Sequence, residues 1–126
     1  MGFFSNIANS MRESKEKAKL EAMQVADRIE YMDLASACRV LANELKTASS
    51  LPKRASLTQV FTEKLKKTEN RDELYWAFSD MYQQSMRGSN RMYELNMAQK
   101  IGKRLYEMGD LRVEANSDET SFRPKY

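Results

Sequence analysis

The residue types that carry nucleophilic and metal chemistry are scarce in this chain, which has 126 residues and no histidine. Without histidine, Ser-His and Cys-His nucleophilic pairs and every histidine-bearing zinc site are excluded. The single cysteine, Cys38, excludes an internal disulfide and a cysteine cluster. A lone thiol on the apolar side of a helix favours a small buried residue in a reducing compartment, so we expect a cytoplasmic protein.

The remaining candidates for acid–base chemistry are carboxylates, and the densest set is Glu69, Asp72 and Glu73. These residues stand where a helix is expected to begin, and the helix dipole favours negative charge there, so no catalytic role is needed to explain them. No Walker, dinucleotide-binding, EF-hand or metalloprotease pattern occurs. We therefore expect a protein that is not an enzyme, with no catalytic residues, no cofactor and no bound metal.

The positive charge of the chain is concentrated in one segment. Residues 34 to 69 hold seven basic and three acidic side chains, whereas the net charge of the whole chain is only +3. A basic segment of this kind can bind phosphate or nucleic acid, particularly beside a helix N-terminus. However, no aromatic side chain alternates with the basic ones for base stacking, so we treat this function as the alternative. Its candidate residues are Lys53, Arg54, Lys64, Lys66 and Lys67.

The elements that position these residues are expected to be helices. The length fits one domain, and 31% charged residues, four Gly, two Pro and a mean hydropathy of −0.73 indicate a helical protein with a polar surface. No apolar run is long enough to span a membrane. We predict an all-α fold, a bundle of four or five helices over residues 1–109 with a long first helix, followed by a flexible tail at 110–126.

Apolar spacing of three and four residues predicts helices at about 4–32, 34–48, 57–68, 71–86 and 91–108. The apolar stripes of the first two are rotated relative to one another, so a break is expected near residues 31–33 with Asp33 as N-cap, and one continuous helix contacting two partners is the alternative. Ser56 is the expected cap of the third helix and Asn70 that of the fourth, whereas Gly109 is expected to end the fifth. At about 40 Å, the first helix is longer than a small domain is wide, so part of it is expected to project or to pair with another chain.

Several large apolar side chains fall outside these stripes. The only tryptophan, Trp76, shares a helix face with Asp72, Asp80 and Gln83. Either the first helix or the tail covers it, or it anchors a partner, since tryptophan is enriched at binding hot spots. Off the main stripe of the first helix are Leu20, Met23 and Tyr31, which form a second candidate contact face, within the chain or across a homodimer. A third interpretation is peripheral membrane contact through Phe3, Phe4 and Ile7, against docking of that helix end on the core.

One local resemblance involves the predicted fifth helix. Its residues Ala98, Ile101, Gly102, Leu105 and Gly109 resemble the first helix of a tetratricopeptide repeat. The resemblance covers less than a fifth of the chain, and it implies no peptide-binding residues here because the polar tail cannot supply the second helix. The sequence as a whole predicts a small interaction protein, an adaptor or inhibitor, that presents helix faces to another protein or to its own copy.

Overall fold

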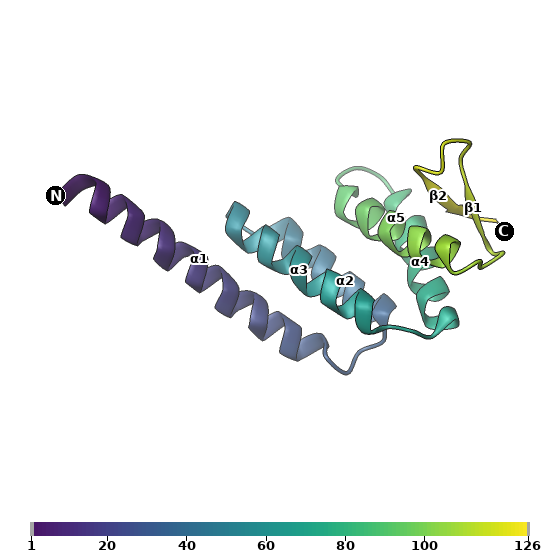
Figure 1. Ribbon diagram of the computed structural model, residues 1–126, viewed down its shortest axis with the longest axis horizontal. Helices are drawn as coiled ribbons and strands as arrows, with labels where there is room; N and C mark the ends of the chain where they lie inside the picture. The colour runs from purple at the N-terminus through teal and green to yellow at the C-terminus, as the bar shows by residue number, and fades with distance from the viewer. Residues whose placement is uncertain (1, 126) are drawn as a thin grey trace.

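A computed structural model describes residues 2–125 and, for residues 2–11, the backbone only. The described residues form five helices and a small sheet (Figure 1). The helices are α1 (Gly2–Ile29), α2 (Leu34–Thr47), α3 (Leu51–Lys67), α4 (Arg71–Ser85) and α5 (Met92–Glu107), and the strands are β1 (Val113–Ala115) and β2 (Phe122–Pro124). The predicted helical bundle with a long first helix is therefore confirmed. None of the described helices is both long and apolar enough to cross a membrane.

The break between α1 and α2 lies where the rotation of the two apolar stripes predicts it. The Asp33 carboxylate caps α2, accepting hydrogen bonds from the Ser36 backbone N (3.2 Å) and the Ser36 hydroxyl (2.7 Å). These bonds, led by the one from the hydroxyl, hold the pKa of Asp33 below its ordinary value. Because the chain turns here, α2 runs back along α1 and both stripes reach one core, so the alternative of a single continuous helix is wrong.

Helix α3 begins six residues earlier than predicted. Its N-cap is Ser50, whose hydroxyl accepts from the Lys53 backbone N at 3.3 Å, and the prediction of Ser56 as the cap is wrong. Pro52 lies in the first turn of this helix. A proline has no N–H to lose in the first turn, where N–H groups lack intrahelical partners, so α3 accommodates it there.

The remaining helix ends agree with the prediction. The Asn70 side chain caps α4 by accepting from the Glu73 backbone N at 2.9 Å. Helix α5 ends before Gly109, which adopts a φ of +76°. A side chain would strain the backbone there, so glycine suits this helix stop.

The helices form two layers that share α2. Helix α1 packs along α3, and α2 contacts α3, α4 and α5. The ion pair of Glu21 with Lys53 and the bond from Lys64 to the Glu30 carbonyl show that α1 and α3 run parallel. Because α3 starts at the level of the middle of α1, the N-terminal half of α1 extends beyond the bundle (Figure 1).

The predicted membrane contact through Phe3, Phe4 and Ile7 concerns side chains outside the described ones.

The C-terminal segment carries more structure than the sequence suggests. Strands β1 and β2 pair antiparallel, with Ala115 opposite Phe122, and the pair packs on α5. Phe122 is buried because Gly102 leaves room for it: a Cβ at Gly102 would lie 2.9 Å from the Cβ of Phe122. The Gln99 side-chain amide holds the strand by bonding both the N (2.7 Å) and the O (2.9 Å) of Phe122. A hairpin thus follows α5, where a tetratricopeptide repeat would have its second helix.

Candidate interaction surface

Trp76 lies on the outer face of α4, and 65% of its surface is exposed. Within the described residues, neither α1 nor the C-terminal segment covers it. The prediction that one of these segments buries Trp76 is therefore wrong. Its ring makes an edge contact with the ring of Tyr75, with centroids 6.0 Å apart and an interplanar angle of 61°. The contact holds one edge of the indole and leaves most of its surface available to another molecule.

Two ion pairs lie one helical turn to either side of Trp76. On the N-terminal side, Asp72 accepts from Arg112 at 3.0 Å. On the C-terminal side, Asp80 binds the Arg39 guanidinium through both carboxylate oxygens, at 2.6 and 2.7 Å. These pairs tie α4 to the C-terminal segment and to α2. The exposed indole therefore lies between two ion pairs on the same helix. Such an arrangement is typical of an apolar residue at the centre of an interface, surrounded by a polar rim.

Arg112 is itself held from several sides. Its guanidinium lies 4.4 Å from the centroid of the Tyr75 ring and binds both oxygens of Asp110, at 2.7 and 3.0 Å. The hydrogen bonds from Arg112 hold the pKa of the Asp110 carboxyl below its ordinary value, although burial opposes the shift. The aromatic pair of Tyr75 and Trp76 is thereby bordered by an arginine that stays charged and is bound by Asp110 and Asp72.

The other predicted partner-binding residues lie elsewhere on the molecule. Leu20 and Met23 are on the outer face of α1, and Tyr31 is in the turn that follows it, with exposed fractions of 61%, 60% and 93%. Helix α1 packs on α3 and α2, whereas Trp76 is on α4, which packs on α5 and α2. The sequence thus identifies exposed residues, but the structure separates them into two surfaces, one on α4 and one on α1.

The basic segment is largely engaged within the chain. Lys53 forms an ion pair with Glu21 at 2.9 Å, and its hydrogen bond lowers the pKa of that carboxyl. Arg54 donates to the Ala48 carbonyl at 3.2 Å, and Lys64 donates to the Glu30 carbonyl at 2.9 Å, beyond the last turn of α1. Lys66 lies 3.9 Å from Glu63 within α3. Lys53 and Lys64 therefore help to hold α3 against α1, whereas Lys66 and Lys67 at the end of α3 are exposed.

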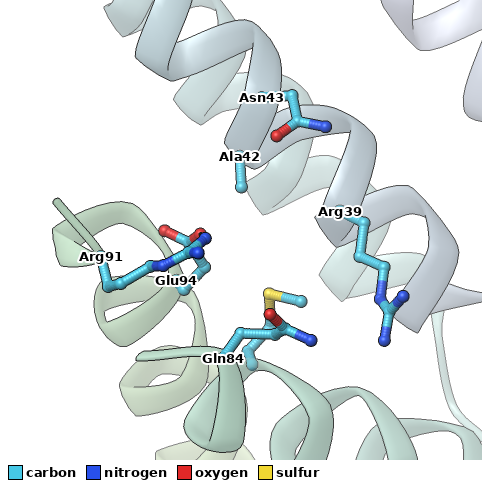
Figure 2. A pocket seen from close by; sticks show the side chains of 7 residues that line it. Arg39, Ala42, Asn43, Gln84, Arg91 and Glu94 are labelled. Carbon is cyan, nitrogen blue, oxygen red and sulfur yellow. The ribbon is translucent and has the colours of Figure 1, made fainter. Parts of the chain in front are cut away.

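A small polar pocket of about 170 Å³ opens between α2, α4 and α5. Figure 2 shows Arg91, the N-cap of α5, and Glu94 of α5 pointing toward one another on one side, with Gln84 of α4 below them and Arg39 and Asn43 along α2. The Glu94 side chain is only 5% exposed, and its Oε2 accepts from Lys46 and from Arg91, the latter at 3.0 Å. Its Oε1 is enclosed and has no hydrogen-bond partner among the residues that the structure describes.

The Glu94 carboxyl remains charged despite its burial. Burial works to raise its pKa, but the hydrogen bonds from Lys46 and Arg91 outweigh that effect, so the pKa lies below the ordinary value. A carboxylate held by two cations is a poor general base, and the thiol of the buried Cys38 has a raised pKa, so neither is an activated group. No set of side chains suited to hold a metal occurs within the described residues.

Sequence reasoning missed Glu94, although a signal was present. The residue stands three, four and seven positions before Met97, Ala98 and Ile101, all of which are buried, so it lies on the apolar stripe of α5. A charged residue on such a stripe predicts a buried ion pair. Its partner Lys46 is 48 residues away, and spacing cannot identify it.

In comparisons with known proteins, no family model matches this chain, and no curated protein sequence or solved structure gives a significant match.

Proposed function

We propose that this protein is a non-enzymatic interaction module that binds another protein through the face of α4 around Trp76. The observation that carries the proposal is the exposure of the only tryptophan, 65%, between two ion pairs. Exposing a large aromatic ring to water has no benefit for the folded chain, whereas burying it against a partner removes apolar surface from water. A regulator, adaptor or inhibitor would act by occupying its target through this face.

The expected contribution of Trp76 is large. A tryptophan at the centre of an interface costs about 2 kcal/mol or more when it is truncated to alanine, which is about thirtyfold in the dissociation constant. The Trp76→Ala variant should fold normally, because the side chain contributes little to the core. This separation between binding and stability distinguishes an anchor from a core residue.

The test compares capture of proteins from the native cell by wild type, Trp76→Ala and Leu111→Ala. Leu111 is a matched control because it is an apolar side chain that is even more exposed and lies in the segment after α5. We expect one set of partners to be retained by wild type and Leu111→Ala and lost by Trp76→Ala, with equal melting temperatures. Equal capture by all three proteins, or a large loss of stability in Trp76→Ala, would contradict the proposal.

The competing function is binding of phosphate or nucleic acid by the basic segment. The excess of basic residues between 34 and 69 supports it, but the engagement of Lys53, Arg54 and Lys64 within the chain weakens it. It predicts retention on nucleic acid at low salt, with a salt dependence that falls when Lys66 and Lys67 are neutralised. Absence of retention at low salt would eliminate it.

The compartment is also part of the proposal. The single Cys38 is buried and free, which suits a reducing environment such as the cytoplasm. Fractionation of the native cell tests this assignment, and recovery from an oxidising compartment would contradict it.

A further inference from the structure

The outer face of α1 carries a regular row of side chains that do not pack into the bundle. The opposite face packs into the bundle through Ala18, Ala22, Val25 and Ile29. The outer face has the same helical spacing, and each of its side chains is exposed: Arg12, Glu16, Leu20, Met23 and Asp27. Steps of four, four, three and four residues keep these positions on one line of the helix, so they form a continuous seam about 22 Å long.

We propose that this seam is the interface between two copies of the chain, paired antiparallel along α1. The two-fold axis passes between positions 19 and 20 of both helices. In this register the two Leu20 side chains meet beside the axis, each Met23 lies level with the partner's Glu16, and Arg12 faces the partner's Asp27 at each end. An interface of this kind is isologous, because the same surface is used twice.

Charge complementarity identifies a second copy as the occupant. Arg12 and Asp27 make no side-chain hydrogen bond or ion pair among the described residues, and about 22 Å of helix prevents them from meeting within one chain. In the antiparallel register they pair twice, and Lys19 comes within one turn of the partner's Glu16. A parallel pair would instead place identical charges opposite each other, which is unfavourable.

The shape of the molecule allows this pairing. The bundle lies on the opposite side of α1, and the N-terminal half of the helix extends beyond it, so a second α1 can lie alongside without meeting α2 or α3 (Figure 1). With only two apolar residues per copy at its centre, the dimer is weak and forms in a concentration-dependent way.

The test is a charge exchange measured by sedimentation equilibrium of the full chain up to about 1 mM. We expect wild type to form a dimer and the single variants Arg12→Asp and Asp27→Arg each to weaken it about tenfold, because each change converts two attractions into two repulsions. The double variant should regain the wild-type dimer. Lys17→Asp, the same charge change at an exposed position about 100° around the helix, is the control and should leave the dimer intact.

Each contrary outcome overturns the inference. A wild-type protein that stays monomeric over the whole range has no such interface. A dimer that both single variants leave intact uses another surface, and a double variant that does not recover has another register. The inference is independent of Trp76, so Trp76→Ala should lose its partners and still dimerise.

Discussion

Replacing Glu94 with glutamine tests whether the buried ion pair between Lys46 of α2 and Glu94 of α5 stabilises the fold. The substitution keeps the size of the side chain and removes its charge. Lys46, whose side chain is only 17% exposed, then loses its carboxylate, and Arg91 loses the same acceptor. The wild-type Oε1 is already without a partner, so the amide nitrogen that can replace it would add a buried donor with no acceptor.

The magnitude follows from these contacts. Hydrogen bonds to charged groups contribute about 1.5–3 kcal/mol, and breaking a buried ion pair costs about 3–5 kcal/mol. Lys46 and Arg91 lie near enough to the surface to turn toward water, which recovers part of that cost. We therefore expect Glu94→Gln to lower the free energy of unfolding by about 3 kcal/mol, equivalent to a drop of roughly 10 °C in Tm for a domain of this size.

Thermal and urea unfolding followed by circular dichroism measure this loss. The control is Glu44→Gln, which breaks the exposed pair of Glu44 with Arg28 (2.8 Å) and should cost less than about 1 kcal/mol. A double variant, Lys46→Met with Glu94→Leu, should recover most of the loss, because an apolar pair of similar volume avoids the desolvation of two charges. If Glu94→Gln costs no more than Glu44→Gln, the ion pair is not a determinant of stability and the reasoning fails.

Three further predictions concern the fold. Gly102→Ala places a Cβ 2.6 Å from Cε1 of the fully buried Phe78. The cost of this overpacking should exceed the gain in helix propensity, so we expect urea unfolding to show a loss of about 1–2 kcal/mol in the free energy of unfolding. Equal or greater stability would show that Phe78 has room to move. Ser50→Ala should cost about 1 kcal/mol as loss of a cap, and Ser56→Ala less than about 0.5 kcal/mol; the reverse order would restore Ser56 as the cap. The carboxyls of Asp33, Glu94 and Asp110 have lowered pKa values, so the stability they contribute is complete above about pH 4.5 and is lost as the pH falls through their native values. Urea unfolding between about pH 6 and pH 2 should show this loss, which is smaller in Glu94→Gln, and an identical pH dependence in the two proteins would contradict the assignment of Glu94.

The parts of the fold that the sequence predicts are those determined by neighbouring residues. Asp33 and Asn70 cap helices by bonding to backbone groups three residues later, and Gly109 needs only its own φ. The start of α3 was missed because Ser50 and Ser56 both offer caps to a helical segment. Spacing alone does not choose between them, since the choice depends on whether the turn containing Pro52 packs with the helix.

The parts that the sequence does not predict depend on contacts between distant residues. The polar position of Trp76 follows from spacing within α4, but its flanking pairs join residues 40 and 41 positions apart. The hairpin forms because Phe122 fits against Gly102 on α5, a contact that neither segment indicates alone. For the same reason, spacing identifies four exposed apolar residues but does not show that one lies on α4 and the other three on α1 and the turn after it.

The Trp76 face on α4 and the seam on α1 share no helix, and α1 packs on α3 and α2, so one surface can be occupied without covering the other. A dimer through α1 would present two Trp76 faces joined by folded helices. Two linked faces bind a target with two sites more tightly than either face alone, because the second contact forms at a high local concentration. Weak pairing of α1 would therefore make binding of such a target depend on protein concentration, and binding of a target with one site would not show that dependence.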